Sequence, residues 1–179
     1  MRTVYLLLIS VVFSACGTME SIVKSSFPYT TDVMITKTSM PGKEYSSVNE
    51  ASSLDQSFRK SGNNADKIDA VHIISAQLRA AGRNADYNIG QLSSVQIYMS
   101  KANGKDEVMV ASQKNINPAT GNTMLLDIDN SHFLDELVRE PSVSVRVKYK
   151  LRNKTSKDVN LRVILNMAAY PKGNYLAVQ

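Results

Sequence analysis

The chain has 179 residues, of which 43% are hydrophobic and 21% are charged, a balance that allows a buried core and argues against disorder. Tryptophan is absent, aromatic residues make up only 7%, and the single cysteine excludes any disulfide within the chain. The formal charge of +5 is modest but uneven, because nine basic and only two acidic residues fall between positions 139 and 172. This composition favours an exported β-rich domain over a helical bundle.

The chain begins with a short apolar leader. Arg2 gives the leader one positive charge, and residues 4–13 are apolar with a single serine among them. This run suits a secretory signal and has about half the length that a membrane-spanning helix needs. The leader ends in the sequence FSAC at residues 13–16, which resembles the lipobox of bacterial lipoproteins, with a phenylalanine where that family most often has leucine.

This resemblance implies a lipid anchor. In lipoproteins of this kind the cysteine thiol receives a diacylglycerol, a peptidase cuts before the cysteine, and acyl chains such as palmitate are added. The resemblance therefore implies that residues 1–15 are a signal peptide, that Cys16 is the lipidated first residue of the mature protein, and that residues 16–28 are a tether. The alternative is a buried N-terminal strand with an ordinary core cysteine, which leaves the charge and the small residues before Cys16 unexplained.

The residues after the cysteine bear on location. Gly17 follows it and no aspartate stands there, which by resemblance to proteobacterial lipoproteins implies sorting to the outer membrane. Residues 17–24 contain Glu20 as their only acid, so they lack the acidic tract that resembles a surface-export signal in Bacteroidota lipoproteins. We therefore expect a lipid-anchored protein on the periplasmic face of the outer membrane.

The first part of the mature chain predicts a strand, a turn and a helix. Residues 29–38 are apolar at alternate positions and predict a strand, and residues 40–43 contain the Pro-Gly pair of a turn. Ser47 and Glu50 have the spacing of a capping box, and Val48 begins a helical spacing of apolar residues that ends near Gly62. A short helix is therefore expected here, with an extended serine-rich loop as the alternative.

From residue 68 onward the apolar period changes to two, which predicts strands. Alternation at residues 70–79 predicts one strand, and residues 95–99 and 108–112 predict a hairpin around Asn103 and Gly104. A turn at residues 117–122 and a strand at residues 123–128 follow. A short helix is then expected, capped by Asn130 or Ser131, containing Leu134 and Leu137, and stopped by Pro141.

The last two predicted strands, residues 142–152 and 159–170, are expected to pair as a hairpin through the polar segment 153–158. Many short strands separated by turns predict a mainly β fold, an antiparallel β-sandwich with one or two short helices, spanning residues 29–179. This layout resembles small immunoglobulin-like or transthyretin-like envelope domains. Such a resemblance concerns the fold and does not give the function.

Enzyme and metal chemistry find little support in the sequence. His72 lies on an apolar strand and His132 in a predicted first helical turn, neither in a nucleophile motif, so no catalytic residue and no cofactor is expected. Asp127, Asp129 and Asn130 offer oxygen atoms that could hold Ca²⁺. Calcium loops usually carry more carboxylates and a glycine turn, so a solvated acidic face is the favoured interpretation.

The clearest candidate for binding is an alternation in the strand at residues 142–152. Five apolar side chains from Val143 to Leu151 face one way, towards the core. The opposite face carries a row of basic residues, and Arg162 on the predicted partner strand is expected to extend it. We call these residues the basic strip: Arg146, Lys148, Lys150, Arg152 and Arg162. Like charges about 7 Å apart repel unless they are solvated or countered.

Three interpretations of the basic strip stay open. It is a solvated basic face, or it binds an anionic envelope component (lipid head groups, lipopolysaccharide phosphates or an acidic protein subunit), or it binds nucleic acid. Nucleic acid ranks last, because stacking aromatics are missing from the strip. We expect a non-enzymatic accessory subunit of a membrane-associated envelope complex, with a stand-alone ligand-binding or adhesion lipoprotein as the alternative and a hydrolase as a distant third.

Overall fold

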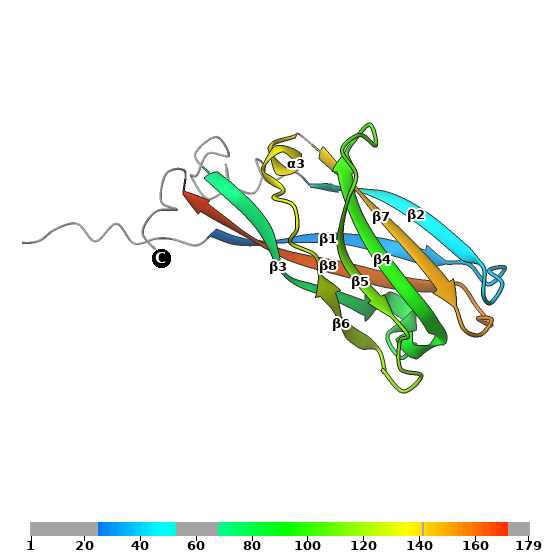
Figure 1. The fold of residues 1–179 in the computed structure, drawn as a ribbon. Coiled ribbons are helices and arrows are strands. Elements are labelled where there is room, and N and C mark those ends of the chain that lie inside the picture. Colours follow the sequence, from blue (N-terminus) through cyan, green and yellow to red (C-terminus); the bar gives the residue numbers. More distant parts are fainter. Residues whose placement is uncertain (1–24, 53–67, 141, 172–179) are drawn as a thin grey trace, which may run out of the picture.

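The computed structural model describes residues 25–52, 68–140 and 142–171 (Figure 1). Within these residues the protein is mainly antiparallel β, as the sequence predicts, with one α-helix and short 3₁₀ turns. The strands are β1 (Ser25–Ile35), β2 (Glu44–Ser52), β3 (Ile68–Ala80), β4 (Leu92–Lys101), β5 (Val108–Lys114), β6 (Thr123–Ile128), β7 (Ser142–Leu151) and β8 (Val159–Pro171). The helical elements are η3 (Gly82–Asn84), η4 (Ile89–Gln91) and α3 (Asp135–Arg139).

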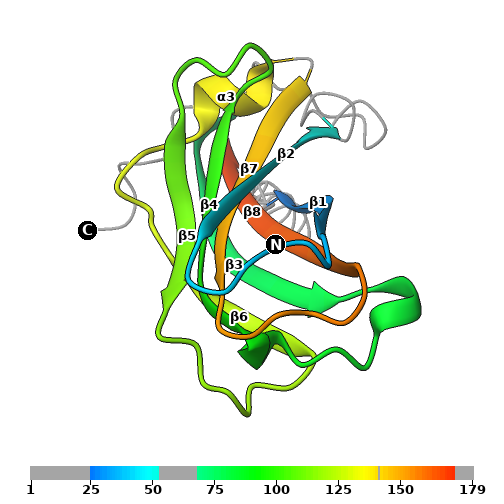
Figure 2. The same cartoon turned by 90° about the vertical axis from the view of Figure 1, so that its right-hand side faces the viewer.

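The strands form one eight-stranded sheet, in the order β1-β8-β3-β6-β5-β4-β7-β2, that folds back on itself as two packed layers. Strand β6 belongs to both layers: Thr123 to Leu126 pair with β3, whereas Asp127 and Ile128 pair with β5. Strands β1, β8 and β3 make up the rest of one layer, and β5, β4, β7 and β2 the rest of the other. Figure 2 shows the layers facing each other, with the edge strands β1 and β2 on the side away from β6.

The core lies between the layers and is built by alternation along each strand. On β4 and β7, Ile97 and Val145 point inward and are at most 1% exposed. Opposite them, Ile73 of β3 and Val163 and Leu165 of β8 are equally buried. Each such aliphatic side chain removed from water contributes about 1.5–3 kcal/mol, so the alternation that predicts the strands also supplies most of the stabilisation.

Several local predictions are confirmed. The hairpin of β4 and β5 turns through Gly104, whose φ of +80° lies in the left-handed region that glycine adopts without strain. Strand β6 has the bounds that the sequence predicts, and Gly42 forms the turn after β1. The alternation on β3 holds, although its register shifts between Ile73 and Ser75, which moves the buried set from odd to even positions.

The expected hairpin between residues 142–152 and 159–170 is wrong. Strand β7 pairs with β4 and β2, whereas β8 pairs with β1 and β3 in the opposite layer. The connection between them therefore crosses from one layer to the other, a distance of about 10 Å that six or seven residues easily span. Alternation shows only that each strand buries one face, which a hairpin and a crossing connection satisfy equally well.

The helix expected from Ser47 onward is also wrong in its first part, and residues 53–62 lie outside the described residues. The segment Glu44–Ser52 is strand β2, antiparallel to β7 from Glu44 opposite Lys150 to Ser52 opposite Ser142. Backbone pairing along the whole of β7 outweighs a capping pattern that contributes about 1 kcal/mol. Val48, the first apolar residue of the expected helical spacing, is 50% exposed on this strand.

The short helix before β7 exists, but it is α3 (Asp135–Arg139) and neither Asn130 nor Ser131 caps it. The side chain of Asn130 instead bonds to the backbone of Ile73, accepting from its N at 3.1 Å and donating to its O at 2.9 Å. The segment before α3 therefore supplies hydrogen bonds to backbone groups of β3 that lie beyond the end of its pairing with β6. In the described part of the chain, no helix combines the length and apolar character required to cross a membrane.

Candidate binding face on strand β7

The outward side of β7 lies in the middle of a four-stranded layer. Its neighbours are β2 on one side and β4, followed by β5, on the other. Outward side chains of these strands align in three rows across the layer, which together we call the β7 face. The rows are Val48–Arg146–Tyr98–Met109, Ser46–Lys148–Gln96–Ser112 and Glu44–Lys150–Ser94–Lys114.

The alternation predicted for this strand is confirmed. Val143, Val145 and Val147 are at most 2% exposed and face the core, as do the two larger residues that follow at the same spacing. Arg146, Lys148 and Lys150 project to the other side and are partly exposed. The structure thus brings three of the five predicted basic residues together on one face.

Each of these three cations has a partner within the protein. Arg146 Nε lies 2.7 Å from Glu107 Oε1, a carboxylate just before β5. Lys150 Nζ lies 3.8 Å from Glu44 Oε2, and Lys148 Nζ stands 4.8 Å from the centre of the Tyr98 ring. The charges that were expected to repel are therefore largely countered, and the face is mixed in character.

Arg152 and Arg162 lie apart from the β7 face. Arg152 follows the end of β7, where its backbone N donates to Gln91 O at 2.7 Å and its guanidinium donates to Ile116 O. Arg162 is on β8 and faces outward from the other layer, so the expectation that it extends the basic strip is wrong. Arg162 lies there because the connection after β7 crosses to the other layer before β8 begins.

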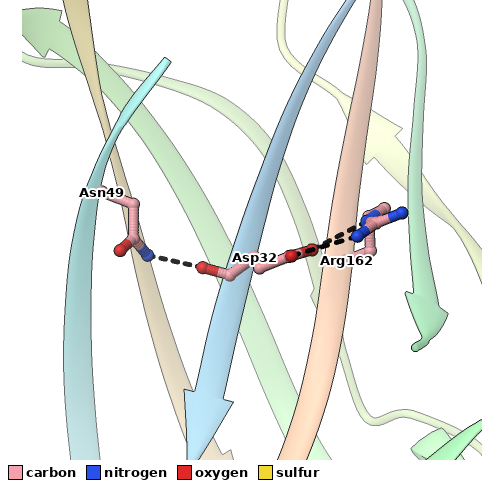
Figure 3. A network of polar contacts seen from close by, with 3 residues as sticks. All are labelled: Asp32, Asn49 and Arg162. Carbon is pink, nitrogen blue, oxygen red and sulfur yellow. Dashed lines mark hydrogen bonds and ion pairs between the residues drawn. The ribbon is translucent and has the colours of Figure 1, made fainter. Parts of the chain in front are cut away.

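Arg162 belongs instead to a network that closes the gap between the two edge strands (Figure 3). Its Nε and Nη2 donate to the two carboxylate oxygens of Asp32 on β1, at 2.7 and 3.1 Å. The backbone O of Asp32 accepts from Nδ2 of Asn49 on β2 at 2.6 Å. The hydrogen bonds from Arg162 hold the pKa of the Asp32 carboxyl below its ordinary value of 3.8. We call these three residues the seam.

Sequence reasoning missed the seam, because its members are far apart in the chain. Asp32 and Arg162 are separated by 130 positions and Asn49 lies on a segment predicted as a helix. Asp32 is the only charged residue of β1, and its side chain is exposed, so nothing in the local sequence required it to have a partner.

The other candidate residues occupy structural positions. His72 is half-buried, with Nδ1 3.1 Å from Ala70 O and its ring stacked on that of Tyr170, and His132 is exposed. Asp129 accepts a hydrogen bond from Ser131 N at 2.9 Å, and its bonds with Ser131 lower its pKa. Across the residues that the structure describes, no group of three or more His, Cys, Asp or Glu side chains could hold a metal ion. Cys16 lies outside them.

Comparison with other proteins adds no further information about this chain: no protein-family model matches the sequence, and none of the curated proteins matches it. The composition and geometry of the β7 face are therefore the structural features that bear on function.

Proposed function

We propose that this protein is a lipoprotein of the bacterial cell envelope, anchored through Cys16 at the periplasmic face of the outer membrane, that acts as a non-enzymatic accessory subunit of a membrane-associated complex. The β7 face is its contact with the rest of that complex. The lipobox-like sequence supports the anchor, and the make-up of the β7 face supports the contact.

The observation that carries the contact is the first row, Val48–Arg146–Tyr98–Met109. Val48 is 50% exposed in the middle of β2, where it packs against no core. Tyrosine, methionine and arginine are the residue types enriched at the centres of protein interfaces. A face meant only for anionic lipid would carry unpaired lysines, whereas here each cation of β7 already has a partner.

The contact is tested by purifying the full-length lipoprotein from detergent-solubilised membranes and identifying the proteins that accompany it. The charge-reversed triple variant Arg146→Glu, Lys148→Glu, Lys150→Glu is expected to lose its companion proteins. A matched control reverses three exposed cations elsewhere, Arg79→Glu, Arg83→Glu and Lys105→Glu, with the same change in net charge. Unchanged co-purification of the first triple variant would rule out the β7 face as the contact.

A single substitution separates a protein partner from an anionic component such as lipopolysaccharide phosphate. Val48→Lys adds a positive charge to the first row without touching any of the three cations. It is expected to disrupt a protein contact by at least tenfold in affinity, because a charge would be buried there, whereas it would strengthen attraction to an anion. Stronger binding of Val48→Lys to anionic vesicles, together with an intact set of companion proteins, favours the stand-alone binding lipoprotein instead.

The anchor has its own test. Cys16→Ser removes the only thiol in the chain and hence the only site for thioether lipidation. The variant is expected to lose incorporation of labelled palmitate and to move from the detergent phase to the aqueous phase in a phase-partition assay. Retention of the label in Cys16→Ser would show that the leader is not a lipoprotein signal.

A further inference from the structure

A hollow of about 310 Å³ opens at one end of the sandwich, away from the β7 face. One wall comes from the segment that links β3 to β4, with Tyr87 and Gln91, and the other from the connection between β7 and β8, with Lys154, Thr155 and Lys157. We call it the end pocket. It adjoins Val159, which pairs with Ile35, the last residue of β1, so it lies at the opposite end of β1 from Ser25. Figure 1 shows β1 running along the length of the molecule.

The walls of the end pocket are held together by hydrogen bonds, so its shape exists before any ligand binds. Asn153 Nδ2 donates to Gln91 Oε1 at 2.9 Å, and Arg152 N donates to Gln91 O at 2.7 Å, which fastens one wall to the other. Asn88 Nδ2 donates to Pro118 O at 2.7 Å and its Oδ1 accepts from Gly90 N at 2.8 Å. Binding pockets for small molecules are commonly preformed in this way.

Two residues that line the end pocket, Tyr87 and Thr155, carry buried hydroxyl groups. Tyr87 Oη and Thr155 Oγ1 are buried and have no hydrogen-bond partner among the described protein groups. Thr155 is only 7% exposed. Burial raises the pKa of Tyr87 to about 12, so its phenol stays neutral and remains a donor at physiological pH. Their oxygens are covered in the unliganded structure, so a ligand in the end pocket reaches them only after a side-chain rotation. Buried hydroxyls are almost always bonded in folded proteins, and such a rotation would give these two a polar partner.

The rim of the end pocket is positive. Lys154 and Lys157 are exposed, neither forms an ion pair within the described residues, and no carboxylate is among the lining side chains. The acid that follows them, Asp158, accepts a hydrogen bond from Lys37 N at 2.8 Å and so has its own partner outside the pocket. In contrast to the cations of the β7 face, these two lysines have no ion-pair partner among the described residues, so the rim suits an anionic group.

We propose that the end pocket binds a small polyhydroxylated anion, a sugar-sized molecule that carries a carboxylate or a phosphate. Hydroxyl groups of the ligand bond to Tyr87 and Thr155 once these two side chains rotate towards the pocket, and the anion lies between Lys154 and Lys157. The volume falls at the lower end of the range for small-molecule pockets, which fits one sugar ring rather than a polymer. This site is independent of the contact proposed for the β7 face.

The test is an NMR titration of ¹⁵N-labelled full-length protein in detergent micelles with four probes: glucuronate, glucose 6-phosphate, glucose and inorganic phosphate. Glucuronate or glucose 6-phosphate is expected to shift amide signals of residues 82–91 and 153–159, and to bind at least tenfold tighter than glucose or phosphate. The tighter of the two acids identifies the anion as carboxylate or phosphate. Absence of shifts with both acids at about 50 mM overturns the proposal, as does equal binding of phosphate alone.

Variants assign the groups within the pocket. Thr155→Val and Tyr87→Phe keep the shape but remove one hydroxyl each, and each is expected to weaken binding about five- to tenfold. Because neither hydroxyl has a partner among the described residues, the melting temperature of the unliganded variants is expected to stay unchanged or to rise. Lys154→Gln with Lys157→Gln removes the preference for the acids over glucose. Tyr98→Phe and Lys105→Gln, outside the pocket, serve as controls. Unchanged affinity in all the pocket variants overturns the proposal.

Discussion

Arg146 and Arg162 both alternate with apolar residues in the sequence, but the structure places them in different roles. Both lie at outward positions of long strands, and each has its Nε 2.7 Å from a carboxylate oxygen. Arg146 pairs with Glu107, a residue of the adjoining hairpin, on an open face. Arg162 pairs with Asp32 on an edge strand that a second bond ties to the opposite edge. The comparison shows that an arginine's role depends on what its partner is attached to.

The seam connects the two edge strands of the sheet, because β1 and β2 are the first and last strands in the strand order. Edge strands expose unpaired backbone groups, and here a side chain of one edge bonds a carbonyl of the other. The β7 face has no such task, since its strand is already paired on both sides. Stability experiments should therefore respond to the seam, and association experiments to the β7 face.

The largest effect on stability is expected when the ion pair and the Asn49 hydrogen bond of the seam are removed together. Asn49→Ala with Arg162→Met removes the link between β1 and β2 and leaves Asp32 without its partner. We expect a fall of about 4–8 °C in melting temperature and faster hydrogen exchange in β1 and β2. The matched change on the other layer, Arg146→Met, is expected to lower the melting temperature by less than about 1 °C. An equal fall in melting temperature for the seam double variant and for Arg146→Met would show that the seam stabilises the fold no more than the ion pair on the β7 face does.

A smaller effect is expected from the hydrogen bond of Asn49 alone. Its net contribution is about 1 kcal/mol, so Asn49→Ala lowers the melting temperature by about 2–4 °C. Ser46→Ala on the same strand is the control, since the described structure shows no side-chain bond for Ser46, and it should behave as wild type. A scan of both variants by circular dichroism checks this, and a loss shared by Ser46→Ala would point to strand propensity instead.

The stabilisation by the ion pair should depend on pH. Asp32 has a folded-state pKa below its ordinary 3.8, chiefly because Arg162 bonds to it, so the unfolded chain takes up the proton more readily. The contribution is therefore complete above pH 3.8 and is lost as pH falls through the lower, folded-state value. Urea unfolding of wild type and Asp32→Asn should differ at pH 7 and converge in strong acid. A difference in unfolding free energy between wild type and Asp32→Asn that persists in strong acid would indicate that the substitution acts through packing and not through the ion pair.

The smallest effect is expected on the β7 face itself. Lys148→Met removes the contact of the ammonium with the Tyr98 ring, which at the lower end of the range for exposed sites contributes about 0.5 kcal/mol. We expect the melting temperature to change by no more than about 2 °C, while Lys148→Arg keeps or improves the contact. A larger loss in Lys148→Met would give the face a structural role and weaken its assignment as a contact surface.

The sequence predicts the parts of this fold that depend on neighbouring residues. Alternation assigns the buried face of β7, the glycine at position 104 marks a hairpin, and residues 123–128 form a strand as expected. The pairing of β2 with β7 and the crossing from β7 to β8 depend on contacts between distant segments, which no local pattern encodes. The end pocket was missed for the same reason, because its two walls lie more than sixty positions apart.

The candidate site was only partly predictable. Arg146, Lys148 and Lys150 share a face because they share a strand, which spacing alone shows. Their contacts with Glu107, Tyr98 and Glu44 depend on strand order, and so does the position of Arg162 in the other layer. The sequence thus predicts which basic residues share a face of β7. It does not predict the electrostatic potential of that face, which depends on residues of the neighbouring strands.

The pairing of Asp32 with Arg162 also bears on how β1 would respond to a pull. The two residues face each other in a ladder that runs from Ser25 opposite Ala169 to Ile35 opposite Val159. Sliding β1 by one residue would turn its buried side chains outward, and sliding it by two would set Asp32 against Asn160 or Ile164. Since β1 is the first described strand after Cys16, tension from a membrane anchor would act along this ladder, and the ion pair fixes the register against slippage.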